Sequence, residues 1–423
     1  MKALVVLFVA TCGVAMFGQD PQSNDAGMAT PVSALASLID EAHRNNPDIR
    51  AMSHSYAAAG QMSKAAGALP DTQLMVQHLG VGSPRPFAGY TNSDFAYIGL
   101  GAAQEFPWPG KRKLRQQAAE LQAGAMHAQI EAVTRNVIEQ VKLAYFKLAY
   151  LQQTLGILQS DDKVLSDMEQ IAESRYRVGK GNQQEVLKAQ LQHTRILQEI
   201  NVHHREEAAR QVQIKRYLGR AQDSPDIVTE PLRQRALPPD AQELFSRLRE
   251  NNPEIAAGKS NLSRANKLVE LSRKEFKPDF GVQYMYQNTD RRFRDYYMAT
   301  LTVTMPNRGR RRAELAQALE EQQAAAANVD AETQRRLAEV EEQYRAARLS
   351  LDQLKIYREG LMPQARATFQ SAMSAYQANR QDFETLLSSF RDVLDFEEQY
   401  QKELGEYESA LARLESLTGV NLP

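Results

Sequence analysis

The stretch QEFPWPGKR, residues 104–112, separates two segments of different periodicity. Residues 94–106 read as a strand, whereas no proline follows between Pro109 and Pro225. Residues 110–178, taken as one helix, would reach roughly 100 Å at about 1.5 Å per residue. The apolar residues recur in steps of three and four, which predicts a coiled-coil seam. They are Val133, Val137, Val141, Ala144, Leu148, Leu151 and Leu155.

The same pattern of proline and glycine residues recurs about 200 residues later, which predicts an internal duplication. The quoted stretch returns as Met305-Pro306 with Gly309-Arg310-Arg311. Four further landmarks keep the same order. They are Asn46-Pro47-Asp48-Ile49 with Asn252-Pro253-Glu254-Ile255, Pro70-Asp71 with Pro278-Asp279, Tyr176 and Gly179 with Tyr376 and Asn379, and Tyr217-Leu218-Gly219 with Leu417-Thr418-Gly419.

We expect each copy to contain one helix, two strands and a long helical hairpin. The first copy covers residues 32–220, residues 221–238 form a linker, and the second copy covers residues 239–423. The first helices are predicted over 32–66, with Pro31 suited to the N-terminus, and over 241–274. Only Pro363 interrupts the run from Pro306 to Pro423. The second coiled-coil seam lies in this run and reads Val340, Tyr344, Ala347, Leu351 and Leu354.

Four segments alternate like strands, at 72–79, 94–106, 280–287 and 297–305. One apolar and one polar face suits a strand with lipid outside and water inside, and each segment is about long enough to cross a membrane at the usual 9–11 residues. The alternative is a soluble antiparallel sheet with one wet face. Trp108, at the change from strand to helix, is a candidate membrane-interface anchor.

The N-terminus reads as a secretory signal over residues 1–18, followed by a polar tail over 19–31. Lys2 precedes an apolar run from Ala3 to Ala15, and cleavage after Ala15 or Gly18 fits. The only cysteine, Cys12, lies inside this segment, so the mature chain suits an oxidising compartment. The alternative is a lipidated Cys12.

These features favour the membrane interpretation and predict a mainly helical chain with membrane β-strands. Four strands cannot close a barrel, and open sheet edges are not tolerated in lipid, so the chain must assemble with copies of itself. Two copies would give about eight strands with a filled interior. Three copies would leave a water-filled lumen, so we expect a homotrimer with a twelve-stranded barrel in outer-membrane lipid.

Composition excludes several other functions. The 423-residue chain has 43% hydrophobic and 24% charged residues and a net charge of −1, which does not suit a nucleic-acid-binding protein. No phosphate loop, His-Glu-x-x-His motif or nucleophile elbow is present, so we expect no enzyme and no cofactor. His193, His203 and His204 fit a solvated helix face, and no metal site is expected.

The chain resembles the TolC family of outer-membrane efflux proteins over essentially its whole mature length. Residues 46–49, the stretch 104–112, Arg175 to Gly179 with Glu185 to Gln190, Leu361 to Ala365 and Tyr376 to Leu387 carry this resemblance. The wording Phe-Pro-Trp-Pro-Gly-Lys-Arg at 106–112 is closest to the heavy-metal-efflux branch. The resemblance implies a trimer with a periplasmic helical tunnel. It also implies docking to a periplasmic adaptor (membrane fusion) protein and to an inner-membrane pump of the resistance-nodulation-division type.

The hairpin tips are predicted at Gly179 and Asn379, because Gly and Asn best tolerate the left-handed conformation of a helix reversal. The resemblance implies that the adaptor contacts these tips. The Val-Gly dipeptide of the family is retained as Val178-Gly179 and altered to Ala378-Asn379. The implied docking residues are Tyr176, Arg177, Val178, Gly179 and Lys180 at the first tip, and Ala378, Asn379 and Arg380 at the second.

The resemblance also implies a gate, in which Tyr376 can bond to Glu185. The arginine that completes the gate elsewhere in the family is Gln381 here, with Arg380 one position earlier, so an ionic lock is not supported. Thr385 and Ser388 occupy the usual places of a lumen-facing acid ring. Asp382 and Glu384 lie nearby and complete the set of candidate gate residues.

Two other classes of protein stay open at the level of sequence. One is a soluble periplasmic coiled-coil adaptor or scaffold, which would be expected to carry one hairpin between compact β-domains. The other is an enzyme with a coiled-coil insertion. The exported substrate cannot be read from the sequence, because a duct passes whatever its pump delivers.

Overall fold

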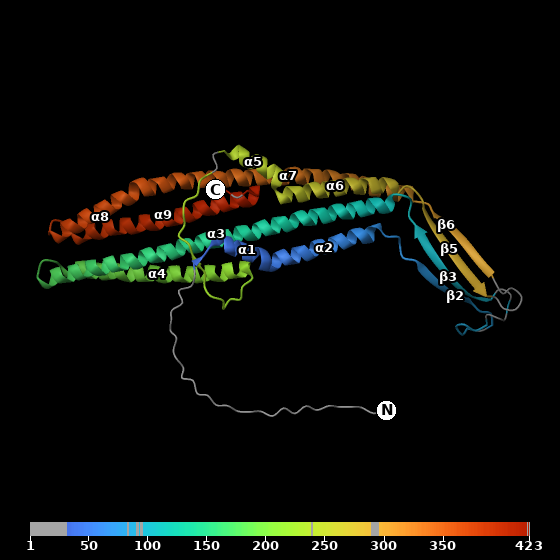
Figure 1. The fold of residues 1–423 in the computed structure, drawn as a ribbon, viewed down its shortest axis with the longest axis horizontal. Coiled ribbons are helices and arrows are strands. Elements are labelled where there is room, and N and C mark those ends of the chain that lie inside the picture. Colours follow the sequence, from blue (N-terminus) through green and yellow to red (C-terminus); the bar gives the residue numbers. More distant parts are fainter. Residues whose placement is uncertain are drawn as a thin grey trace, which may run out of the picture.

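The computed structural model is a long helical body with a four-stranded sheet at one end and two hairpin turns at the opposite end (Figure 1). It describes residues 32–82, 84–89, 93, 96–237, 240–288, 296–420 and 422. The predicted signal, the polar tail and Pro31 lie outside these residues. Among the described residues, no helix has both the length and the apolar character that a membrane span requires.

The two copies predicted from the sequence appear in the same order. The first copy consists of β1 (Val32–Ser33), α1 (Leu35–Asn45), α2 (Pro47–Gly67), β2 (Gln73–Leu79), β3 (Tyr97–Phe106), α3 (Lys111–Arg177) and α4 (Gln183–Leu218). The second consists of α5 (Ala241–Asn251), α6 (Pro253–Lys274), β5 (Asp279–Asn288), β6 (Tyr296–Thr304), α7 (Arg308–Ile356), η1 (Tyr357–Leu361), α8 (Met362–Gln377) and α9 (Phe383–Thr418).

The expectation of one helix over 32–66 and another over 241–274 is wrong, because each is divided in two. Proline disfavours the helical conformation of the residue before it. Asn46, before Pro47, is accordingly extended with ψ 126°, and Asn252, before Pro253, has ψ 122°. The Asn-Pro landmark therefore ends one helix and begins the next.

Each of these asparagines also caps the helix that follows it. The Asn46 side chain accepts hydrogen bonds from the backbone amides of Asp48 (2.8 Å) and Ile49 (3.3 Å), and it donates one to the Tyr217 carbonyl (2.9 Å). Asn252 repeats the arrangement with the Ile255 amide and the Leu417 carbonyl. Both side chains are buried, so each ties the start of a helix to the end of a distant one.

The long helix α3 matches the predicted span closely, whereas its counterpart in the second copy is interrupted. A single π-helical turn, η1, separates α7 from α8 just before Pro363. Proline has no backbone N–H to donate to the preceding turn, and a wider turn accommodates that loss.

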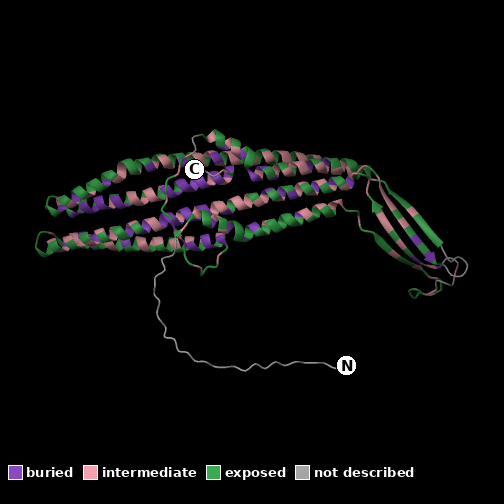
Figure 2. Ribbon diagram, viewed as in Figure 1, coloured by how far each residue is buried: buried purple, intermediate pink, exposed green. Residues whose placement is uncertain are grey.

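The two coiled-coil seams are buried as predicted. Val141, Leu148 and Leu151 are fully buried in α3, and Val340 and Ala347 are fully buried in α7. Figure 2 shows the buried residues concentrated where the helices face one another. The buried apolar residues form three clusters in the helical body, one of which lies behind the hairpin turns.

The predicted linker 221–238 packs against the middle of the helical body. It contains β4 (Val228–Thr229), which pairs in parallel with β1. Arg235 forms ion pairs with Glu408 (2.6 Å) and Glu415 (2.7 Å) of α9. The segment between the copies thus fastens them together.

The four strands form one antiparallel sheet in the order β2-β3-β5-β6, so β2 and β6 are its edges. The alternation predicted from the sequence gathers apolar side chains on one face of the sheet, where Leu74 (82%), Tyr297 (70%) and Leu301 (69%) are largely exposed. Figure 2 shows exposed residues along all four strands. The sheet therefore presents an apolar surface that this chain alone does not cover.

A cluster of charges joins the sheet to the helices. Lys111, buried at the start of α3, donates to the Asp279 carboxylate (2.9 and 3.0 Å) and to the Lys277 carbonyl (3.0 Å). It also pairs with Glu275 (3.1 Å). Trp108 lies at the same junction and stacks on Phe280 with ring centroids 5.8 Å apart, while its role as a membrane-interface anchor stays a prediction.

We expect Asn46→Ala to lower the free energy of unfolding by roughly 1–3 kcal/mol, because it removes a helix cap and leaves buried backbone groups unpaired. Denaturant unfolding of the purified protein, followed by circular dichroism, measures the change. Asn45→Ala, at an exposed neighbouring position, is the matched control. A loss no larger than that of the control would contradict a capping role.

Candidate functional site

The two turns at the far end of the helical body have the same backbone geometry. In the first, the amides of Val178, Gly179 and Lys180 donate to the carbonyls of Ser174, Tyr176 and Arg175. In the second, the corresponding amides of Ala378, Asn379 and Arg380 donate to Ser374, Tyr376 and Ala375. The duplication therefore extends to individual hydrogen bonds of the tips.

Both predicted tip residues have positive φ, 72° at Gly179 and 62° at Asn379. Glycine reaches this conformation without cost, and asparagine is among the side chains that tolerate it best. An added Cβ at Gly179 would meet nothing within 4 Å, so the glycine is required there by conformation rather than by space. The sequence prediction of the two turns is confirmed.

The helices behind the tips share one apolar core drawn from α3, α4, α8 and α9. Tyr376 lies within it at 1% exposure and meets the Phe383 ring edge-on at 5.6 Å. Leu165 and Met168 of the first hairpin and Leu386 of the second are fully buried in the same core. The two hairpins of one subunit thus pack together as a single body.

The hydrogen bond anticipated between Tyr376 and Glu185 is present. The phenol donates to Glu185 Oε2 at 2.8 Å, from the second hairpin to the first. Burial and this hydrogen bond raise the pKa of the Tyr376 phenol above its ordinary value. The neutral phenol is the form that the fold favours, so it stays protonated and able to donate throughout the neutral range.

The counterpart of this pair in the other copy is different. Tyr176 corresponds to Tyr376, but it is 48% exposed at the surface of the first tip. Thr385 corresponds to Glu185, so the acid is absent as well. Within the described residues, the strong tyrosine–carboxylate contact is made by one of the two tips.

Arg175 is a contact residue for which the sequence analysis gave no role. Its guanidinium donates to the Tyr376 carbonyl and the Asn379 side chain of the second tip, and to the Lys180 carbonyl of its own turn (3.4 Å). It also lies over the Tyr376 ring, 4.3 Å from the centroid. The signal available was its place in the motif Arg175 to Gly179, but its reach across to the other hairpin needed the structure.

The remaining gate candidates make separate contacts. Asp382 caps α9 by accepting from the Thr385 amide (2.9 Å) and hydroxyl (2.6 Å), and these bonds lower the pKa of its carboxyl. Glu384 pairs with Lys188 across the hairpins. Gln381 makes no side-chain hydrogen bond within the described part of the chain. Ser388, like Thr385, is exposed, so the structure brings Tyr376 and Glu185 together and leaves the others apart.

The docking candidates form an accessible surface. Val178 is 67% exposed and the Arg177 side chain 71% exposed, with an ion pair from Arg177 to Glu173 (3.4 Å). Gly179, Lys180 and the second-tip residues 378–380 are likewise exposed. Their role in docking stays a prediction.

Further from the tips, a carboxylate of α3 and a carboxylate of α9 face the same groove between the hairpins. Asp161 and Glu397 line a shallow groove with Gln153 and Gln401. Burial and the charge of Glu397 raise the pKa of Asp161 to about 6, while Arg366, which is paired with Glu397, opposes the shift.

His193, which the sequence places on a solvated helix face, pairs with Asp162 and Glu169. Among the described residues, no group of three or more His, Cys, Asp or Glu is placed to hold a metal ion.

Comparison with known proteins identifies relatives by sequence profile and by structure. The profile of the family Outer membrane efflux protein matches residues 38–220 and 244–420. The outer-membrane channel OprN aligns with a TM-score of 0.78 at 18% identity, covering 92% of this chain and 90% of that one. The outer membrane protein VceC of Vibrio cholerae aligns with a TM-score of 0.77 at 18% identity, covering 92% and 97%.

The Neisseria gonorrhoeae outer membrane channel MtrE, in its open state, aligns with a TM-score of 0.75 at 17% identity, covering 91% of this chain and 88% of that one. At these identities the structural likeness establishes the fold alone. No curated protein sequence matches the chain.

We expect the contact of α3 with α9 to weaken as the pH rises through about 6, where Asp161 ionises. The folded-state pKa lies above the ordinary value, so the stabilisation is complete in acid and is lost above that pKa. Asp161→Asn should raise the thermal midpoint at neutral pH and flatten its pH dependence, measured by circular dichroism. Asp167→Asn, at an exposed carboxyl on the same helix, should leave the profile unchanged. An unaltered profile in Asp161→Asn would contradict the assignment.

Proposed function

The chain belongs to the outer membrane efflux protein family, and from that premise we propose that three copies form the exit duct of a tripartite efflux system. It is an outer-membrane protein that extends into the periplasm, and it is not an enzyme. In the proposed system an inner-membrane pump, of the resistance-nodulation-division type, delivers substrate through a periplasmic adaptor. The duct itself passes that substrate passively.

The unpaired edges of the sheet are the observation that carries the proposal. Strands β2 and β6 end a four-stranded sheet whose outward face is apolar. In lipid, exposed backbone groups at two edges would cost several kcal/mol per group, so the sheet must close. Three copies give twelve strands, enough to enclose a water-filled lumen.

The direction of the duct follows from the opposite ends of the body. The sheet and the hairpin tips lie at the two extremes of the long axis (Figure 1). With the sheet in the outer membrane, the tips reach toward the inner membrane, where an adaptor would meet them. We propose that the adaptor contacts the exposed Val178-Gly179 tip first, and that the Ala378-Asn379 tip supplies a second, unlike contact.

The gate is proposed at the junction of the two hairpins. Tyr376 and Glu185 hold them together within a subunit, and Arg175 ties the first hairpin to the second tip. Opening would separate these groups, driven by the partner proteins. The alternative of a soluble periplasmic adaptor or scaffold is disfavoured, because residues 38–220 and 244–420, which include both hairpins, match the outer-membrane family.

Planar-bilayer conductance of the purified protein tests the duct and its gate. Tyr376→Phe keeps the ring in the core and removes the hydrogen bond to a carboxylate, which is worth roughly 1.5–3 kcal/mol. Because that bond favours the closed tip, the open-channel population should rise about ten-fold or more. Tyr176→Phe, at the exposed counterpart, should behave like the unaltered protein. A protein that never conducts, with or without Tyr376→Phe or Glu185→Gln, would overturn the proposal.

Site-specific photo-crosslinking in living cells tests adaptor docking. A photoreactive residue at Val178 should capture a protein that mass spectrometry identifies as a periplasmic adaptor. The same residue at Val212, an exposed valine (57%) on α4 well away from the turn, is the control. Equal capture of the adaptor at both positions, or none at Val178, would contradict docking at the first tip.

A further inference from the structure

The two β-hairpins of the sheet have the same internal register once the copies are superposed by sequence. In the first copy Leu74 lies opposite Ala102, and in the second Val282 lies opposite Leu301. Leu74 is the counterpart of Val282, and Ala102 is the counterpart of Leu301. The correspondence of residues between the copies is therefore fixed by observed strand pairing and not by sequence landmarks alone.

The pairing of β3 with β5, here called the internal joint, shows how the last strand of one copy meets the first strand of the next. The same pairing can form between two subunits. Here β3, the last strand of the first copy, pairs with β5, the first strand of the second, with Ala102 opposite Tyr284 and Gln104 opposite Val282. The edge strands β6 and β2 are the last strand of the second copy and the first strand of the first. In a ring of identical subunits, β6 of one subunit meets β2 of the next in the same sense.

Resting on the trimer proposed above, whose closed sheet brings β6 against β2 of the partner subunit, we infer that this joint adopts the register of the internal joint and carries a salt bridge of its own. Transferring that register places Leu301 opposite Val76 of the partner subunit. It also places Val303 opposite Leu74 of the partner subunit. A salt bridge from Arg310 to Asp71 of the partner subunit closes the inner end of this joint.

The apolar faces support this register. Leu301 (69% exposed) and Val303 (46%) project to the outward side of β6, and Leu74 (82%) and Val76 (64%) project to the outward side of β2. In the inferred register all four lie on one continuous outer surface. A shift by one residue would place these apolar side chains opposite inward-facing residues. The outer face would then no longer be continuously apolar, which is unfavourable for a sheet with lipid on one side and water on the other.

The charges at the sheet–helix junction support it independently. At the internal joint, Lys111 binds Asp279, whose carboxylate also accepts the Trp108 amide (2.7 Å). The counterparts of Lys111 and Asp279 are Arg310 and Asp71. Lys111 is buried within its cluster, whereas the Arg310 side chain is 72% exposed. Within the described part of the chain, its one ion pair is with Glu314, one turn along its own helix.

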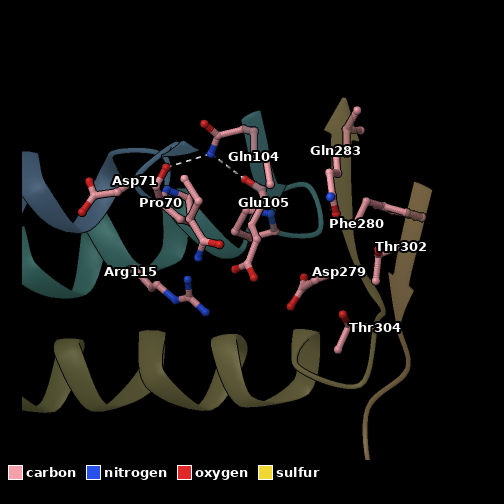
Figure 3. Close-up of a pocket in the computed structure, with 15 residues that line it drawn as sticks. Pro70, Asp71, Gln104, Glu105, Arg115, Asp279, Phe280, Gln283, Thr302 and Thr304 are labelled. Carbon is pink, nitrogen blue, oxygen red and sulfur yellow. Dashed lines mark hydrogen bonds between the residues drawn. The ribbon is translucent and has the colours of Figure 1, made fainter. Parts of the chain in front are cut away.

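Asp71 is left without a cation in the single subunit. It is exposed, and no ion pair or hydrogen bond of its side chain occurs within the described residues. Figure 3 shows it at the cavity of about 320 Å³ beside the junction, with its carboxylate turned away from Glu105 and Arg115. An unpaired acid and an exposed arginine thus stand at the two edges that the internal joint predicts will meet.

The neighbouring arginines identify Arg310 as the bridging residue. Arg112 of the first copy donates to the Gly67 carbonyl (2.7 Å), and its counterpart Arg311 pairs with Glu275 (3.3 Å), the counterpart of Gly67. Arg311 is therefore engaged inside its own subunit, as Arg112 is. This leaves Arg310 in the place that Lys111 occupies at the internal joint.

Engineered disulfides test the register directly. The inward-facing pair Gln73→Cys and Thr304→Cys falls opposite in the inferred joint. Within one subunit the two positions are three strand spacings apart, about 14 Å, which exceeds the reach of a disulfide at about 7 Å between Cα atoms. Oxidation should therefore produce covalent dimers and trimers, and no larger species, on a non-reducing gel. Single-cysteine variants control for Cys12, the only native thiol.

A displaced pair provides the matched control. Gln73→Cys with Thr302→Cys keeps the same face but is offset by about 6.7 Å along the strand, so it should crosslink several-fold less. More efficient crosslinking by this pair would overturn the register and leave the trimeric duct intact. Trimers by native mass without crosslinking in either pair would overturn the strand pairing. Monomers by native mass would overturn the duct itself.

Charge reversal tests the salt bridge. Arg310→Glu and Asp71→Arg should each lower the temperature at which the oligomer dissociates on a gel, and the double variant should recover most of the loss. Arg312→Glu, at an exposed arginine in the same helical turn, is the control. Single variants that match the control, or a double variant no better than the singles, would overturn the pairing of Arg310 with Asp71 of the partner subunit.

Discussion

The backbone hydrogen bonds at the two edges of the sheet are the constraint on which the rest of the structure depends. A four-stranded sheet with an apolar outer face can enter lipid only if both edges find partners. One chain cannot supply them, because β2 and β6 are separated by β3 and β5. The proposed assembly in a ring, with a lumen inside it, follows from meeting this requirement.

Internal duplication helps the sheet edges to find partners, because the pairing that joins the two copies within a chain can also join one chain to the next. The copies keep their charged residues at the sheet–helix junction, where Lys111 and Arg310 are counterparts. They diverge at the tips, where Tyr376 is buried against Glu185 while Tyr176 is exposed and faces no equivalent acid. In the proposed trimer, the membrane end would therefore be close to sixfold in character, whereas the tips would be threefold.

Much of this fold could be predicted, because the lengths of the helices and the positions of the turns depend on residues close together in the sequence. A proline-free heptad run bounded by Gly110 gave α3 almost to the residue, and the need for positive φ located both turns. The division at Asn46 was not predicted, although proline restricts the residue before it. The π-helical turn was not predicted either, although Pro363 was recognised as an interruption, because the proline alone does not say how the preceding turn adjusts. Arg175 was missed because its partners lie about 200 residues away, where pairing depends on packing rather than on spacing.

The stoichiometry of the purified protein in detergent tests the central claim most directly. Native mass spectrometry counts subunits without assuming any fold. The account predicts a single species of three subunits, since three copies of a four-stranded sheet close with no edge left over. A stable monomer, or a ring of two or four subunits, would contradict it.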